Sequence, residues 1–463
     1  MSHRPLSYQN EIEALAQSYG LDYFPVQFEQ VPPSFMVEVA VYGLPVRMPH
    51  WSFGVRYIYQ LIQHRMGHSH IFEVVIPGNP GHAYLADTNR ETENILVTAH
   101  VLGHADFSKN NLLFRRVQEQ AGYHIVEQAA NHAQRITMAI EEHGMEAVER
   151  VLDAAFALEQ HIDTHQDLRR PLYADIERST PPTSAGPSGG ASQDAFRDRF
   201  AHLPGSIALP ERSPRTAASM PPHPESDLLW FIAHYAPDLD GWERDILLAV
   251  REESFYFKPI FACQIMNEGW ASYWHARLLR EARFLPDEMY VDAIKTHSDV
   301  VRPYAGDAQI SLQVNPYHLG FSLWEHIIEH HGLDVARQIM ASEDDFGFIR
   351  NYLDEDLARR LDLFHYTTRR RGREAVVHDR DIDALKETLL APKYHYGAPH
   401  VQVTEMRRDG TLVLQQDHAL DQRGLEMDSA RKVLEYIHAI WRRPVVLYSV
   451  TGQGKEARLA VGE

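Results

Sequence analysis

Two histidines four residues apart carry the sharpest chemical signal in the sequence. They are His100 and His104, in the segment Ala-His-Val-Leu-Gly-His-Ala-Asp. Residues at i and i+4 share one face of a helix, so both imidazoles can reach one metal ion, as in zinc hydrolases of the HExxH type. In that motif a glutamate base follows the first histidine, whereas this chain has Val101. We therefore expect a metal-binding pair without the usual base; the alternative is a buried, hydrogen-bonded histidine pair.

A second group lies in the segment Met-Asn-Glu-Gly-Trp-Ala-Ser-Tyr-Trp-His, which contains Glu268 and His275. These two residues are seven positions apart and share a helical face, and two histidines with a remote glutamate form a catalytic zinc set. We expect Glu268 to be the third ligand and His275 a fourth ligand or proton donor, with Asp106 or Glu253 orienting water. The alternative is that Glu268 pairs with an arginine inside a helical bundle.

Three other features have simpler interpretations. His161, Asp163 and His165 lie within one turn near a predicted helix end, which favours a satisfied terminal cluster over a second metal site. Cys263 lies in an aromatic helix, where a lone cysteine usually fills space in the core. The basic run at 369–373 is followed closely by acidic residues, so we expect a solvated loop there.

The composition excludes several classes of protein. The 463 residues include 45 Lys and Arg and 64 Asp and Glu, which gives a net charge of −19. This charge disfavours nucleic acid as a partner. A single cysteine excludes internal disulfides and thiolate zinc clusters. The start has no apolar leader, and no apolar run reaches the roughly 18 residues that span a bilayer. We expect a cytoplasmic protein without membrane insertion.

The elements that must position these residues are mainly helices. Apolar residues at three-and-four spacing, together with Asn, Asp and Thr caps, predict a mostly α fold of the α+β class. The prolines between residues 19 and 59 indicate an extended, aromatic segment over a larger body. A helix is expected to open at the Thr88 to Glu91 capping box and to run through both histidines. Other predicted helices cover 146–162, 228–235, 242–257, 259–283 and 316–331.

The domain organisation follows from changes in this pattern. Residues 179–224 are rich in Pro, Ser and Gly and read as a connector between two halves of one helical body, 1–178 and 225–395. After residue 395 the pattern becomes alternating, and Asp409 with Gly410 is a hairpin signature. We therefore expect a small ββαββ module over 396–463. The two halves must share a core if the histidines and Glu268 are to meet.

Seven stretches of this sequence together resemble the SpoVR family, named for stage V sporulation protein R. The most specific is Met-Asn-Glu-Gly-Trp-Ala, and the likeness covers nearly all of the chain outside the connector. Ser108 departs from the family, which tends to have an aromatic residue there. The stretches that carry the resemblance are 19–28, 48–54, 99–111, 251–257, 266–275, 315–321 and 344–352.

The resemblance implies a cytoplasmic bacterial protein linked to assembly of the spore cortex peptidoglycan or to a stress response. In bacteria that do not sporulate, such genes accompany a PrkA-like serine kinase, and no settled activity comes with the family. Two hypotheses follow. The first is a metal-dependent hydrolase, with zinc as the expected ion and an amide bond in a peptide or cell-wall precursor as its target. The second is a non-catalytic regulatory or scaffold protein that acts with the kinase.

Overall fold

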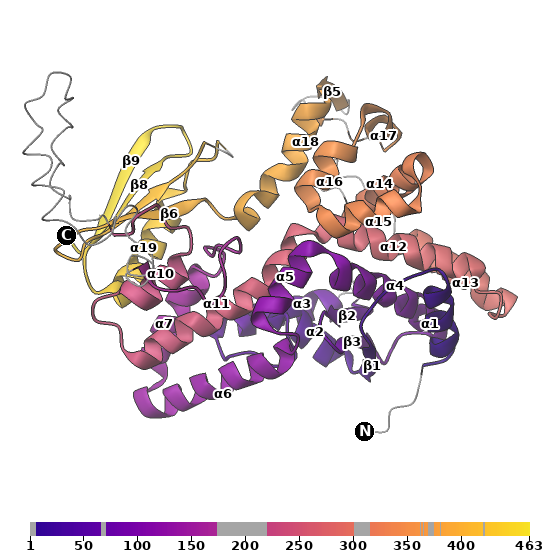
Figure 1. The fold of residues 1–463 in the computed structure, drawn as a ribbon, viewed down its shortest axis with the longest axis horizontal. Coiled ribbons are helices and arrows are strands. Elements are labelled where there is room, and N and C mark those ends of the chain that lie inside the picture. Colours follow the sequence, from indigo (N-terminus) through magenta and orange to yellow (C-terminus); the bar gives the residue numbers. More distant parts are fainter. Residues whose placement is uncertain are drawn as a thin grey trace, which may run out of the picture.

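The computed structural model describes most of the chain. Helices dominate, and the strands form small sheets, which confirms the mostly α, α+β class (Figure 1). None of the described helices is both long and apolar enough to cross a membrane. Residues 179–219 of the predicted 179–224 connector, and the basic run at 369–373, lie outside the described residues. Those described are 6–65, 71–173, 220–300, 315–361, 363, 365–368, 375–379, 381–419 and 422–463.

The N-terminal segment is only partly extended. Its three strands form one sheet in the order β1-β3-β2, in which β1 runs parallel and β2 antiparallel to β3. Two helices occur where extended chain was expected. Pro33 occupies the first turn of α2, where no backbone N–H is needed, and α3 begins only after Pro49. The elements are α1 (Gln9–Ser18), β1 (Val26–Val31), α2 (Pro33–Tyr42), α3 (Trp51–Arg65), β2 (Glu73–Ile76) and β3 (Gly81–Ala86).

The helical body is built from both sides of the connector. The predicted helix over the two histidines exists, but it starts at Glu91. The Glu93 carboxylate accepts the Arg90 N–H, so the capping box begins two residues later than the predicted Thr88. Pro259 lies inside a helix instead of between two, and the break falls at Cys263. These helices are α4 (Glu91–Asn110), α5 (Leu112–Ala121), α6 (Ile125–His143), α7 (Met145–Ala157), α10 (Leu228–Tyr235), α11 (Gly241–Ala262) and α12 (Gln264–Glu281).

A further group of elements covers α12 from the other side (Figure 1). Helix α14 starts at the predicted Asn315 cap, whose side chain accepts the Tyr317 N–H. The group contains α13 (Asp287–Val300), α14 (Pro316–His331), α15 (Leu333–Ser342), α16 (Asp345–Tyr352), α17 (Glu355–Arg360), the β4 (His365–Thr368) and β5 (Ala375–Asp379) hairpin, α18 (Ile382–Leu390) and the 3-10 segment η1 (Ala391–Gly397).

Helix α12 is the centre of the body, packed between α4 and α14. Two close approaches make this possible. A Cβ atom on Gly103 would lie 2.6 Å from the Ala271 Cα atom, and one on Gly269 would lie 2.2 Å from the Gly320 carbonyl carbon. Backbones at this separation tolerate no side chain between them, so glycine is required at both crossings. The large side chains beside these crossings, including Trp270, are fully buried.

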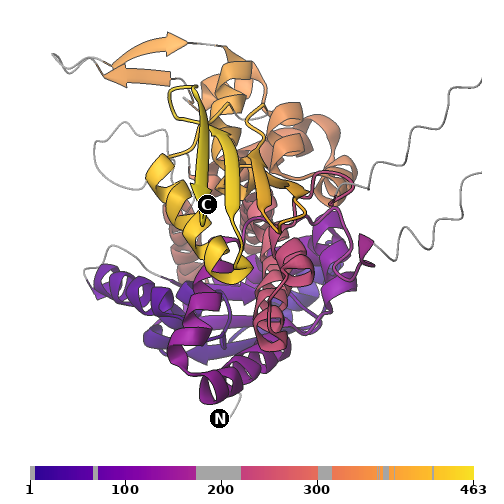
Figure 2. The same ribbon diagram turned by 90° about the vertical axis from the view of Figure 1, so that its left-hand side faces the viewer.

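The C-terminal residues form the expected ββαββ module (Figures 1 and 2). Its sheet has the order β6-β7-β8-β9, and α19 provides the crossover between the parallel strands β7 and β8. The module shares a hydrophobic core with α7, α10 and α11, and Glu225 pairs with Val403 of β6. The elements are β6 (Val401–Met406), β7 (Leu412–Gln416), α19 (Met427–Trp441), β8 (Val445–Val450) and β9 (Glu456–Val461).

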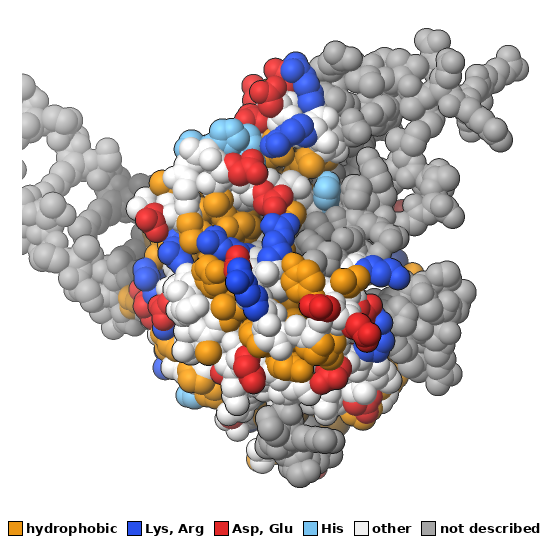
Figure 3. All heavy atoms as spheres, turned by 90° about the vertical axis from the view of Figure 1, so that its right-hand side faces the viewer, with side chains coloured by type: hydrophobic (Ala, Val, Ile, Leu, Met, Phe, Trp, Pro, Cys, Tyr) orange, Lys and Arg blue, Asp and Glu red, His pale blue; other side chains and the backbone are white. Residues whose placement is uncertain are grey.

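The surface combines both signs of charge. On the face drawn in Figure 3, basic and acidic side chains are interspersed with apolar ones. Such mixing is typical of a solvated exterior.

Candidate metal centre

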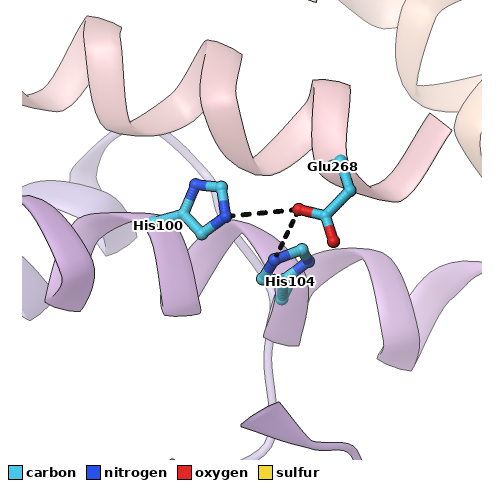
Figure 4. Close-up of side chains that lie close together, drawn as sticks. All are labelled: His100, His104 and Glu268. Carbon is cyan, nitrogen blue, oxygen red and sulfur yellow. Dashed lines mark ion pairs between the residues drawn. The ribbon is translucent and has the colours of Figure 1, made fainter. Parts of the chain in front are cut away.

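The packing of α4 on α12 brings His100, His104 and Glu268 together (Figure 4). The Glu268 Oε2 atom lies 3.5 Å from His100 Nε2 and 3.4 Å from His104 Nε2. The two histidines come from one face of α4, as their spacing predicted, and the glutamate comes from the facing side of α12. One potential ligand atom from each residue lies within 4.8 Å of the others, a set that can surround a single ion.

Hydrogen bonds on the far side of each imidazole fix which ring nitrogen faces this point. His104 Nδ1 lies 2.9 Å from Asn267 Oδ1, which only accepts hydrogen bonds, so Nδ1 carries the proton. In the neutral ring, the Nε2 lone pair is then directed toward Glu268. Metal-binding histidines are commonly held in this way by an acceptor on the other nitrogen.

His275 lies behind His100 and away from the common point. The two Nδ1 atoms are 2.9 Å apart, and His275 is fully buried. When His100 donates this bond, its Nε2 atom has a free lone pair on the side of Glu268. The structure thus places His275 against the candidate ligand His100. Among the described residues, the close group of potential ligand atoms consists of His100, His104 and Glu268.

Two of the converging atoms have no hydrogen bond among the described residues. They are His100 Nε2 and Glu268 Oε2, and both are buried. An unpaired buried acceptor costs about 1–3 kcal/mol, so such atoms usually mark an ion, a water molecule or a function. The two atoms lie 3.5 Å apart, a separation that suits a cation held between them.

The charges at the site support one another. Burial raises the pKa of Glu268, but the neighbouring His104 and His100 outweigh burial and hold that pKa below its usual range. Burial lowers the pKa of His104, while Glu268 and the Asn267 hydrogen bond outweigh it and raise that pKa above the usual value. The carboxylate is therefore ionised and surrounded by groups that a proton or a metal ion can bridge.

Glu73 is a site residue that the sequence did not reveal. Its Oε1 atom lies 3.9 Å from His100 Nε2, at the start of β2. Burial raises the pKa of Glu73, His100 opposes this, and the negative Glu268 adds to it. A carboxyl group with a raised pKa beside a candidate ligand has the properties of a general base. Its only sequence signal is an acidic residue heading an otherwise apolar strand.

A cavity of about 190 Å³ opens onto this group. It is bordered by β2, α4, α12, α13 and the first turn of α14. The Tyr317 hydroxyl is a hydrogen-bond partner of Glu268, and the negative Glu268, burial and Glu73 raise the pKa of Tyr317. The residues that line the cavity include Phe72, Glu73, His100, His275, Thr296 and Tyr317.

Comparison with known proteins places this architecture in a family. The model described as "SpoVR like protein" matches residues 4–397, and the model "SpoVR-like C-terminal domain" matches residues 399–452. The chain belongs to the SpoVR family. A relative, "Uncharacterized protein YcgB" of Escherichia coli (strain K12), is 28% identical over 477 residues, which is 95% of this chain and 90% of the relative. No solved structure matches.

The sequence segments that resemble the SpoVR family include the residues at the helix crossings of this site. Gly103 and Gly269, next to the candidate ligands His104 and Glu268, are residues at which α4 and α14 closely approach α12. Gly320 lies in a third such segment and faces Gly269. These segments therefore contain both the candidate ligands and the glycines that allow the helices to bring them together.

Asp106 and Glu253, the expected water-orienting residues, have other partners. Asp106 is two positions beyond His104, so it points elsewhere on α4, where it accepts the Trp270 Nε1–H at 2.8 Å and the Asp22 N–H at 2.8 Å. Burial raises the pKa of Asp106 to about 6, although these hydrogen bonds oppose it. Neither contact is to a candidate ligand, so Asp106 links α4 to its neighbours.

Glu253 is fully buried on α11 in a different cluster. Its two oxygens accept from Arg47 Nε at 2.7 Å and pair with His132 Nδ1 at 3.1 Å. Among the described residues, its side-chain partners are therefore an arginine and a histidine from outside the candidate metal group. A pair of adjacent glutamates on a helix does not reveal which faces inward.

The other predicted features have plain structural roles. Asp163 accepts the His165 backbone N–H, as in a helix-terminal turn, and the described residues show no group of metal-ligating atoms there. Cys263 is fully buried at the break between α11 and α12, and burial raises the pKa of its thiol well above the usual value. The thiol therefore behaves as a core residue.

Proposed function

We propose that this SpoVR-family protein is a metal-dependent hydrolase whose ion, zinc, is held by His100, His104 and Glu268. One observation carries the proposal. The lone pairs of two imidazoles and a carboxylate converge on one buried point, and two of those atoms have no hydrogen bond among the described residues. Two histidines and one glutamate, with a fourth position left open, form a catalytic rather than a structural zinc set.

The surrounding residues have roles that follow from their contacts. A divalent cation bound here supplies a Lewis acid that polarises a carbonyl oxygen. Glu73, at the wall of the cavity, takes the place of the base that Val101 cannot supply, and it removes a proton from the attacking water. Asn267 and His275 hold the two imidazoles in the tautomers that leave Nε2 free. The substrate is an amide bond in a peptide or a cell-wall precursor.

The substrate class and cellular setting in this proposal come from the family resemblance. They comprise a cytoplasmic location and a link to spore cortex peptidoglycan or to a stress response. The unpaired, buried Cys263 agrees with a reducing compartment.

The second candidate is a regulatory or scaffold protein that works with a PrkA-like serine kinase and catalyses nothing. The observation in its favour is Val101, which fills the position of the HExxH base and is fully buried in the core. In this case the polar group between α4 and α12 specifies the packing of the two helices, as some buried polar groups do.

Elemental analysis of untagged protein distinguishes the metal-dependent hydrolase from the non-catalytic scaffold protein. We expect near-stoichiometric zinc in the wild type and in the control His331→Ala, an exposed histidine at the end of α14, and little zinc in His100→Ala or Glu268→Gln. Melting curves recorded beside the metal content identify variants that have merely unfolded. Folded wild type that takes up no zinc, manganese or iron would refute the hydrolase proposal and direct the next experiment to kinase co-purification.

A further inference from the structure

A second cavity, of about 420 Å³, lies between the C-terminal module and the helical body. It is bounded by the end of α7, by α10, by the chain after η1 and by the inner side of α19 with strands β6, β7 and β8. Its volume falls within the range of small-molecule sites, and such sites favour the junction between two units of a fold. The apolar walls include Leu158, Leu228, Leu414, Val433, Ile437 and Leu447.

Two basic residues are among those that line this cavity. His161 and Arg423 both line it, as does Gln160, whose carbonyl oxygen accepts a 2.7 Å bond from Lys258 Nζ. Lys258 is only 4% exposed. Burial penalises the charged form of this amine, and an anion bound nearby would stabilise that form.

Two of these groups, Lys258 and His161, have pKa values below their usual range. Burial lowers the pKa of Lys258 to about 7, although Asp227, Glu159 and Asp163 oppose it from a distance. Burial, followed by the repulsion of Lys258 and two further histidines, lowers the pKa of His161 to about 4. Burial is the largest cause of both shifts, and an anion bound beside these groups would oppose them.

The backbone beside the cavity is strained. His395 and Tyr396 have positive φ angles of 49° and 59°, a conformation that bulky side chains rarely adopt. This conformation places the Tyr396 ring 3.4 Å from Lys258 Nζ and stacks the His395 ring on that of His400 at 4.1 Å. Strain of this kind is concentrated at ligand-binding segments.

We propose that this cavity binds an elongated apolar molecule with a single anionic head group, a carboxylate or a phosphate. The chain of the ligand lies against α19 and the sheet, and the head group lies at His161 and Arg423, above the buried Lys258. Glu426 also borders the cavity, but its carboxylate accepts the Asp428 and Ser429 N–H groups at the start of α19, so the helix terminus offsets its charge. The site is independent of the metal centre.

Calorimetric titration tests the proposal with three probes that share one chain: dodecanoate, dodecyl phosphate and dodecanol. We expect both anions to bind at least about tenfold more tightly than the alcohol, since charge-assisted hydrogen bonds are roughly twice as strong as neutral ones. The tighter of the two anions identifies the head group. Equal affinity for the alcohol, or no binding of either anion, would overturn the proposal.

Two pairs of variants locate the binding in the cavity. Val433→Trp fills the cavity and should abolish binding, whereas Lys432→Trp places the same side chain on the exposed face of α19 and should not. Arg423→Gln should weaken anion binding about tenfold and leave dodecanol unchanged, with the exposed Arg431→Gln as its control. Melting temperatures and metal content confirm that each variant is folded. Unchanged binding by folded Val433→Trp would refute the assignment.

Discussion

The crossing of α12 and α14 makes a sharp prediction at Gly320. A Cβ atom there would lie 2.1 Å from the Ile265 carbonyl oxygen, 2.9 Å from the Gly269 Cα atom and 3.0 Å from the Gly269 nitrogen. All three are backbone atoms, so no side chain can move aside, and the helices must separate by about 1 Å to restore ordinary contact. Overpacking typically lowers the free energy of unfolding by about 1–3 kcal/mol. Because the neighbours of Gly320 are rigid backbone atoms, we expect Gly320→Ala to lower it by about 3 kcal/mol or more.

Gly54→Ala is the matched control, since the same methyl group meets nothing within 4 Å on exposed α3. Alanine is the better helix former, so this variant should gain about 0.5–1 kcal/mol. Urea titrations followed by tryptophan fluorescence compare the unfolding midpoints, because Trp270 and Trp324 are buried side by side in this core. Gly320→Ala should also weaken zinc binding by displacing α12. A free energy of unfolding within about 0.5 kcal/mol of wild type would refute the packing argument.

Three other predictions test separate parts of the molecule. Glu73→Gln should keep zinc and stability but lose hydrolysis; full activity would exclude Glu73 as the base. Glu252 and Glu253 outweigh burial and raise the pKa of His132 to about 9 from 6.5, so its contribution to stability is complete below pH 6.5 and is lost as pH rises toward 9. His132→Gln should flatten this part of the stability profile, and an unchanged slope would contradict the assignment. Cys263 should react with iodoacetamide only in denatured protein, because burial raises its thiol pKa; rapid labelling of native protein would oppose this.

The candidate ligands were predictable because helical periodicity is a local property. The spacing of His100 and His104 fixes their common face, and their approach to Glu268 then requires only that two helices pack. Glu73 was not predictable, because it reaches His100 from a strand through tertiary packing. His275 shares a face with Glu268, yet it lies nearly two turns further along the helix and so contacts the back of His100.

The fold was predictable where pattern and packing agree. Alternating residues, the hairpin signature and the amphipathic α19 specify the C-terminal module, and Asn315 marks the start of α14. Proline was less informative. Pro33 begins a helix, where no backbone N–H is needed. Pro259 lies inside one, where tertiary contacts can offset the lost hydrogen bond and the clash of the ring with the preceding turn. Sequence alone does not show those contacts.

The origin of the candidate ligands in distant parts of the chain has a consequence for the protein's life in the cell. His104 and its hydrogen-bond partner Asn267 are 163 positions apart, so the ribosome makes the histidines long before the glutamate. The nascent chain thus has no complete site until α12 has been synthesised. An ion captured there would then close a long loop and oppose the separation of α4 from α12 during unfolding. Bound metal would therefore slow the unfolding of each molecule.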